Sequence, residues 1–277
     1  MKMEFIEILK VILLGVVQGI TEWLPISSTG HLILINELFP LEIYTDSVMN
    51  TEFVDMFMVV IQLGSILAVA VLYFKKLNPF KKDKKESLKT INLWMKVAVA
   101  AVPAGIIGLL FDDIIDQYLY NWFTVAITLI IYGIAFIWIE SKKPKNNIKT
   151  IQDLTYKTAF MIGVFQVLAL IPGTSRSGST ILGAVILGLS RPLAAEFSFF
   201  LAIPMMFAAS FLKLIKLSIS LTMFGWVALL LGTIVAFVVS IIAIKTFMTY
   251  IRKHDFKVFG YYRIILGIIV ILYFGVL

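Results

Sequence analysis

The sequence contains no cysteine and only two histidines. Without thiols the chain can form no disulfide bond, and it offers no thiolate as a nucleophile or metal ligand. Charged residues are also scarce, at 15% of the 277 residues, against about 25% in a typical soluble protein. Because 60% of the residues are hydrophobic, the polar side chains are too few to cover a soluble surface. The composition therefore excludes a soluble fold, and it also excludes disorder, which requires low hydrophobicity and high charge.

Long apolar runs make up most of the chain, and the mean hydropathy is +0.96. A membrane-spanning helix needs roughly 20 apolar residues. Six runs approach or exceed this length, and we expect each to span the membrane: residues 54–74, 93–111, 123–139, 193–212, 222–244 and 258–277. The sequence thus predicts an all-α polytopic membrane protein. Because Glu4, Glu7 and Lys10 precede the first apolar stretch, we do not expect a cleavable signal peptide, which would begin with basic residues.

Two further apolar regions, residues 3–39 and 157–189, contain a polar interruption. The first interruption runs from Leu24 to His31 (LPISSTGH), and the second runs from Pro172 to Thr180 (PGTSRSGST). Proline ends a helix because it lacks a backbone donor, and the serines and threonines that follow can cap a new helix. Each region therefore predicts two half-helices joined by a polar break. Such backbone survives at membrane depth only where protein buries it or where it lines a wet cavity.

The two interrupted regions resemble each other. Residues 15–18 and 163–166 both read G-V-x-Q, and each is followed by an apolar residue and P-x-[ST]-S, with a difference of one residue in the spacing. Three predicted spans follow each region. We therefore predict a single integral membrane domain, 1–277, built from a first repeat at 1–140 and a second repeat at 150–277.

The net charge of +7 (24 Lys+Arg against 17 Asp+Glu) comes largely from three loops, within residues 75–89, 142–157 and 245–257. The positive-inside rule places these loops in the cytoplasm, while the acidic loops expected at 42–52 and 112–116 fall outside. The spans alternate correctly if each interrupted region is a re-entrant hairpin, the first entering from outside and the second from inside. Three crossings per half then make the second repeat inverted in the membrane. The sequence has no nucleic-acid-binding motif, so we expect no nucleic acid partner.

Inverted repeats with broken helices carry their binding site near the membrane midplane, and helix N-termini there favour an anion. Glu22 is a carboxylate within an apolar stretch, with Gln18 four residues earlier on the same helix face. Such a charge is a functional candidate, although it could also cap the break. His31 follows the break and could serve chemistry or simply contact backbone. Ser27, Ser28 and Thr29, which lie between Glu22 and His31, could bind a ligand or cap the helix.

Arg176 lies in the second break. Its planar guanidinium can hold phosphate oxygens in a bidentate way, and the alternative is an internal ion pair with Glu22. Gln62, in a predicted span, could support the site. Candidate phosphate-binding groups surround Arg176: the hydroxyls of Thr174, Ser175, Ser177 and Thr180, and the backbone at Gly173, where a ligand can approach closely. One acid, one histidine, one arginine and several hydroxyls suit phosphoryl transfer.

The motifs carry a resemblance to a known family. The segment from Gln18 to Glu22 matches an [EQ]-x-x-x-E motif, and residues 172–180 match P-G-x-S-R-S-x-x-T in full. With the segments 24–31 and 61–65, these motifs identify the chain as similar to the bacterial undecaprenyl-diphosphate phosphatases, the family linked to bacitracin resistance. Many members have Glu where this chain has Gln18, so Glu22 becomes the more important carboxylate.

The resemblance implies hydrolysis of undecaprenyl diphosphate to undecaprenyl phosphate, the lipid carrier for peptidoglycan synthesis, and dependence on Mg²⁺ or Ca²⁺. It implies a multi-pass protein of the bacterial cell membrane whose site opens to the outer side; a homodimer is left open. We expect Arg176 to hold the diphosphate and Glu22 to bind the metal or act as base. His31 or Ser28 would be the nucleophile, or His31 the general acid. The alternative function is a transporter or flippase of a lipid phosphate, because inverted repeats are also transporter architecture.

Overall fold

The computed structural model describes residues 2–119, 121–215 and 220–276, and these form helices without a β-strand. The helices are α1 (Lys2–Thr21), α2 (Ser28–Leu38), α3 (Ser47–Val60), α4 (Gln62–Leu72), α5 (Phe74–Leu77), α6 (Lys84–Leu119), α7 (Trp122–Ser141), α8 (Tyr156–Val167), the 3-10 turn η1 (Leu168–Leu170), α9 (Arg176–Ile186), α10 (Arg191–Ile215), α11 (Met223–Ile251) and α12 (Lys257–Val276).

Six helical segments of the described chain are long and apolar enough to cross a membrane, which confirms the predicted number of spans. The first, Ser47–Leu72, consists of α3 and α4, which meet at Ile61. α6 continues to Leu119, so the expectation of a loop at 112–116 was wrong. No Gly or Pro lies between Leu109 and Leu119, so nothing in that segment ends the helix. The side chains of Asp112, Asp113 and Asp116 lie outside the described part.

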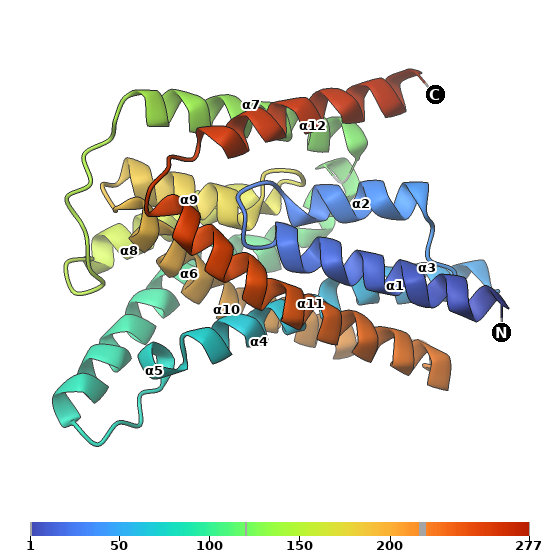
Figure 1. The fold of residues 1–277 in the computed structure, drawn as a ribbon, viewed down its shortest axis with the longest axis horizontal. Helices are drawn as coiled ribbons and strands as arrows, with labels where there is room; N and C mark the ends of the chain where they lie inside the picture. The colour runs from blue at the N-terminus through green and yellow to red at the C-terminus, as the bar shows by residue number, and fades with distance from the viewer. Residues whose placement is uncertain (1, 120, 216–219, 277) are drawn as a thin grey trace.

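The two polar interruptions are breaks between helices, as predicted. α1 and α2 lie side by side and extend from their break toward the end of the molecule where α12 finishes, whereas α8 and α9 extend toward the opposite end (Figure 1). The N-caps of α2 and α9 have the same unusual geometry. Ser27 has φ 76° and Ser175 has φ 72°, and each side chain accepts a hydrogen bond from the glycine N–H three residues later, Gly30 N at 3.2 Å and Gly178 N at 3.1 Å. Both half-helices thus begin in the same way.

The caps also correct the pairing of the two breaks. The sequence match paired Ser28 with Ser175, whereas the structure pairs Ser27 with Ser175, because these two serines share the cap geometry. Each cap lies nine residues after the glutamine of its motif, Gln18 or Gln166. The proline is displaced because the second break carries an additional residue after it, and Gly173 accommodates this residue at φ 84°, a backbone conformation that glycine adopts readily.

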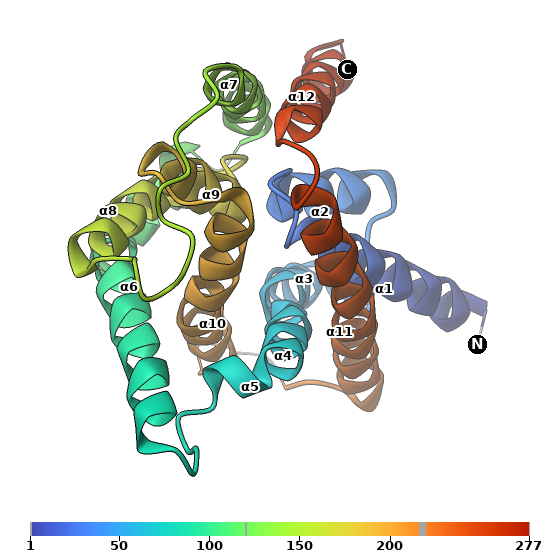
Figure 2. The ribbon, with the colours of Figure 1, turned by 60° about the vertical axis from the view of Figure 1, so that its left-hand side comes forward.

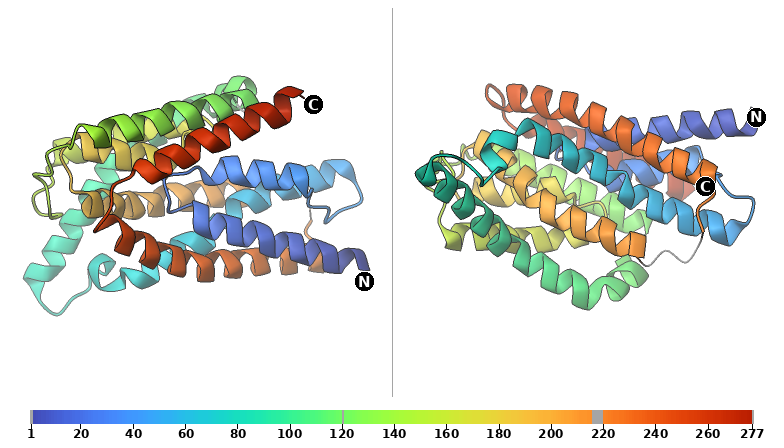
Figure 3. Two further views of the ribbon diagram at one scale, coloured as in Figure 1. Left: turned by 45° about the horizontal axis from the view of Figure 1, so that its top comes forward. Right: turned by 90° about the horizontal axis from the view of Figure 1, so that it is seen from below.

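The helices of the two halves of the chain pack against each other in a reciprocal way. α1 packs on α11 and α8 packs on α6, while α7 pairs with α12 (Figure 2, Figure 3). These contacts are close: a Cβ on Gly15 would lie 2.9 Å from the Gly232 carbonyl oxygen, and one on Gly163 would lie 2.1 Å from that of Ala100. Small residues at such crossings let backbones approach in the membrane.

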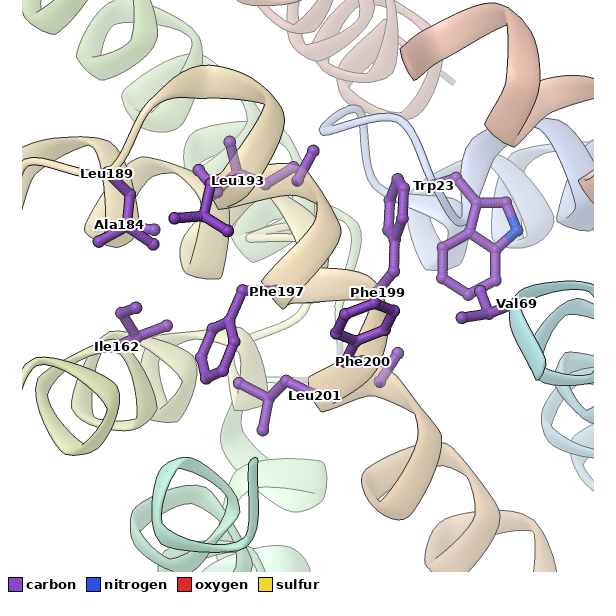
Figure 4. Packing of buried hydrophobic residues seen from close by; sticks show 14 of the residues in the cluster. Trp23, Val69, Ile162, Ala184, Leu189, Leu193, Phe197, Phe199, Phe200 and Leu201 are labelled. Carbon is purple, nitrogen blue, oxygen red and sulfur yellow. The ribbon is translucent and has the colours of Figure 1, made fainter. Parts of the chain in front are cut away.

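The main apolar core surrounds α10 (Figure 4). Phe197, Phe199 and Phe200 are fully buried in one turn of this helix. Trp23, from the first break, meets Phe199 edge to face with ring centroids 5.1 Å apart, a favoured aromatic geometry. The first break is therefore anchored to the centre of the second half of the chain.

Candidate active site

A cavity of about 220 Å³ lies between the two breaks. Its polar lining comes from both: Glu22, Ser27, Ser28 and Thr29 from the first, and Gly173, Ser175 and Arg176 from the second, together with Gln62 at the start of α4. Met205, Met206 and Ala209 of α10 form an apolar wall. Eight of the thirteen residues predicted for the site therefore line one cavity.

Glu22 is the acidic group of this cavity, and only 5% of its surface is exposed. Its carboxylate accepts three hydrogen bonds, from Arg176 Nη2 at 2.7 Å, Ser28 Oγ at 2.8 Å and Gln18 Nε2 at 3.2 Å. Glu22 thus joins the two breaks, and its buried charge is balanced by a guanidinium, as a buried carboxylate requires.

Arg176 makes the ion pair with Glu22 that was the alternative interpretation of the sequence. Its Nη1 donates to the Ser198 carbonyl oxygen at 2.9 Å and to Ser198 Oγ at 3.2 Å. Its Nε is buried and has no hydrogen-bond partner in the described structure. A buried donor without a partner is costly, which marks this N–H as a candidate donor to a ligand in the cavity that Arg176 lines. Ion pairing and anion binding are compatible, because the guanidinium has five donors.

Ser28 lies at the start of α2 with its hydroxyl bonded to Glu22 Oε2. A hydroxyl in hydrogen-bond contact with a base is the arrangement of an activated nucleophile. The N-terminus of α2 adds a partial positive charge at the same point. The contact with Glu22 therefore distinguishes Ser28 from its neighbours Ser27 and Thr29, which the sequence alone did not do.

His31 does not line the cavity. Its Nδ1 lies 2.7 Å from the Ser27 carbonyl oxygen, and its Nε2 lies 2.6 Å from the Tyr262 hydroxyl, with the two rings stacked. Because a carbonyl oxygen only accepts, Nδ1 carries a proton, and Nε2 of the neutral ring accepts from Tyr262. The structure thus shows the backbone contact that the sequence left as an alternative, and a chemical role for His31 stays a prediction.

Four other predicted residues lie behind the cavity rather than on its wall. Gln18 holds Glu22, and Ser177 Oγ contacts the carbonyl oxygens of Glu22 and Leu24, both at 3.1 Å. Thr180 Oγ1 lies 2.6 Å from Ser198 Oγ. Thr174 is fully buried, and its hydroxyl has no partner in the described structure. Apart from Thr174, these side chains hold the breaks in place.

Arg263 is the main residue that sequence reasoning missed. It is fully buried in α12, and its guanidinium donates to the carbonyl oxygens of both breaks: Pro25 at 3.1 Å, Gly173 at 2.9 Å and Thr174 at 3.0 Å. The available signal was its position as a lone charge within an apolar span, which marks a functional candidate. Ser198, the backbone and side-chain partner of Arg176, was missed as well.

These observations define a class: a multi-pass membrane protein with a hydrolase-like polar site enclosed between two helix breaks. Comparison with known proteins gives the family. The family model described as bacitracin resistance protein BacA matches residues 11–269. The chain is 57% identical to undecaprenyl-diphosphatase 1 of Clostridioides difficile (strain 630) over 99% of its length and 98% of the relative. It is 55% identical to an undecaprenyl-diphosphatase of Enterococcus faecalis over 98% of its length and 99% of the relative. The chain belongs to the BacA family.

Proposed function

We propose that this protein hydrolyses undecaprenyl diphosphate to undecaprenyl phosphate and inorganic phosphate, and so recycles a lipid carrier of cell-wall synthesis and confers bacitracin resistance. The observation that carries the proposal is the contact of Glu22 with both Ser28 and Arg176 at one cavity, in a chain whose full-length relatives bear the name undecaprenyl-diphosphatase. A lipid-phosphate transporter remains the rival function, but it does not need a serine paired with a carboxylate.

The cavity suits the two ends of such a substrate. The unpartnered Arg176 Nε and the N-termini of α2 and α9 attract the diphosphate. The apolar wall formed by Met205, Met206 and Ala209 accepts the first part of the hydrocarbon chain. The remaining chain lies between the helices or in the lipid.

Ser28 is the nucleophile that the geometry favours. Its Oγ attacks the terminal phosphorus while its proton passes to Glu22, 2.8 Å away. The bond between that phosphorus and the bridging oxygen breaks, and undecaprenyl phosphate leaves as an anion that needs no proton. Water then attacks the phosphorus of the phosphoserine, and the bond between that phosphorus and Ser28 Oγ breaks. The proton held by Glu22 passes back to Ser28 Oγ, and inorganic phosphate leaves with both protons of the water. Arg176 stabilises the phosphate charge in both steps.

A divalent cation fits the donors of the site. Glu22, Ser28 and Gln62 offer oxygen ligands to one cavity. Among the described residues no group of three or more His, Cys, Asp or Glu side chains gathers, which disfavours a cage made of protein alone. Mg²⁺ commonly uses one or two carboxylates together with substrate phosphates. Bound at Glu22, the ion would supply neutralisation of phosphate charge.

An inverted repeat would explain why two similar helix breaks, one from each half of the chain, meet at one cavity. The matching caps at Ser27 and Ser175, the opposed hairpins and the reciprocal packing of α1 on α11 and α8 on α6 support two related halves, 1–140 and 150–277. With the basic loops in the cytoplasm, the first hairpin is re-entrant from the outer side of the cell membrane. The cavity then receives its lipid substrate from the outer side.

Phosphate release by purified protein in detergent tests the function. Substrate carrying label in its terminal phosphate, quenched during turnover, should leave label on Ser28. Ser28→Ala should abolish both the label and most of the activity. Thr29→Ala is the matched control, because Thr29 lines the same cavity but is not among the hydrogen-bond donors to Glu22 in the described structure; it should retain labelling. Label on His31 would overturn the assignment of Ser28, and absence of phosphate release with transport in sealed vesicles would favour the rival function.

A further inference from the structure

A second and larger cavity, of about 360 Å³, shares no lining residue with the candidate active site. We call it the basic cavity. The three lysine-rich loops meet there: Lys76 and Lys81 come from the segment between α4 and α6, Lys149 from the connection between α7 and α8, and Arg252 from the end of α11. In Figure 1 these segments lie at the end of the molecule opposite to the end where α2 and α12 finish. The positive-inside rule accounts for bases on this face, but not for their convergence on a cavity.

The charges of the basic cavity do not balance. It contains five basic side chains and two acidic ones. Lys76 Nζ pairs with Glu196 at 2.8 Å, and Lys89 Nζ pairs with Glu86 at 2.6 Å. The remaining bases are Lys81, Lys149 and Arg252, whose side chains make no hydrogen bond or ion pair within the described structure. Three basic side chains therefore face one cavity without a hydrogen-bonded or ion-paired acidic partner in the described structure, although Glu86, which pairs with Lys89, also interacts with Lys81.

The other groups of the cavity indicate the kind of anion. α10 begins at Arg191, and its neighbours Ser190 and Leu193 both line the cavity, so the positive end of a 25-residue helix lies at this wall. Behind the charges the wall is apolar, with Leu93, Phe200 and Met248. A basic rim over an apolar floor matches an amphiphile with a phosphate at its head.

We propose that the basic cavity binds the phosphate headgroup of an anionic membrane lipid, at a site separate from the candidate active site. Lys81, Lys149 and Arg252 contact the phosphate, and the apolar floor receives the first carbons of the lipid. Basic pockets between membrane helices on the cytoplasmic side are suited to such headgroups.

Lipid binding by purified protein tests the proposal. The probe is dioctanoyl phosphatidylglycerol, with dioctanoyl phosphatidylcholine and inorganic phosphate as comparisons, and the measurement is the Kd from native mass spectrometry. The test variant carries Lys81→Gln, Lys149→Gln and Arg252→Gln. The control variant carries Lys82→Gln, Lys145→Gln and Lys253→Gln, which remove the same charge from the same three loops but do not line the cavity.

We expect phosphatidylglycerol to bind the wild type more tightly than phosphatidylcholine, and the Kd to rise about 10- to 100-fold in the test variant but less than about threefold in the control. An unchanged Kd in the test variant would overturn the proposal. Equal weakening in both variants would also overturn it, since diffuse charge would then explain the binding. Saturation by inorganic phosphate alone, with no gain from the lipid, would overturn the assignment of a lipid. Phosphate release in detergent should stay at the wild-type rate in both variants, which separates this test from that of the proposed function.

Discussion

Substitution of Arg176 by lysine keeps the positive charge of the site but removes the planar guanidinium group with its several N–H donors. In the structure one guanidinium reaches Ser198 through Nη1 and Glu22 through Nη2, while Nε stays free. A lysine has a single nitrogen, which can replace one of these contacts but cannot reach both sides and still hold two phosphate oxygens. The substitution therefore removes about two charge-assisted hydrogen bonds from the complex with substrate.

The size of the expected loss follows from these bonds. A hydrogen bond to a charged group contributes about 1.5–3 kcal/mol, so the loss of two raises the barrier by about 3–6 kcal/mol. Since about 1.4 kcal/mol corresponds to a factor of ten, kcat/KM of Arg176→Lys should fall by about 10²–10⁴. Initial rates of phosphate release over a range of lipid concentrations in detergent give this value.

Two comparisons make the result decisive. Arg252→Lys changes an arginine that lies outside the candidate active site, and it should retain kcat/KM within about twofold. The Tm of Arg176→Lys should fall less than that of Arg176→Met, because lysine can still pair with Glu22 although Ser198 loses its donor. A kcat/KM within about fivefold of the wild type would show that a point charge is enough, and the argument from bidentate geometry would be refuted.

Further substitutions test other parts of the site and the fold. Glu22→Gln should abolish turnover together with the response to added Mg²⁺, whereas a variant that still responds to the ion would place the ion elsewhere. Ser28→Ala should lower kcat by more than about 10², because the covalent route disappears, and a loss below tenfold would leave Ser28 only as a hydrogen-bond donor to Glu22. Arg263→Met should lower the Tm, since three buried carbonyl oxygens lose their donor; an unchanged Tm would contradict the role of Arg263 in holding the two breaks together. In the cysteine-free chain, an impermeant thiol reagent should label Glu42→Cys from outside the cell and Lys82→Cys only after permeabilisation, and the reverse pattern would invert the topology.

The sequence predicted the parts of the fold that depend on local composition. The spans follow from the lengths of apolar runs, and the breaks follow from Pro25 and Pro172, because each signal is contained in a few neighbouring residues. The end of α6 was misjudged for the same reason: the charges at 112–116 indicated a loop, but no residue there terminates a helix. The pairing of Ser28 with Ser175 was wrong because the P-x-[ST]-S match compares residue types only. The backbone geometry of the N-cap, which Ser27 shares with Ser175, is not visible in the sequence.

The residues of the candidate site were largely predictable, but the hydrogen bonds and ion pairs between them were not. Motif residues indicated Glu22, Ser28 and Arg176, since polar groups at helix breaks stand out against apolar surroundings. The contacts of Ser198 and Arg263 depend on how α10 and α12 pack, and no local pattern gives that packing. His31 was ambiguous in the sequence because its ring partner, Tyr262, lies in the last helix.

The position of Arg263 in that last helix has a consequence for how the protein is made. Both breaks emerge from the ribosome long before α12 does, and until then the carbonyl oxygens of Pro25, Gly173 and Thr174 lack their donor. Unpaired buried backbone groups are costly, so the contact that joins the two breaks forms only when synthesis of the chain is nearly complete. A chain truncated just before residue 263 would thus contain every motif residue of the site but lack the donor that holds the two breaks together.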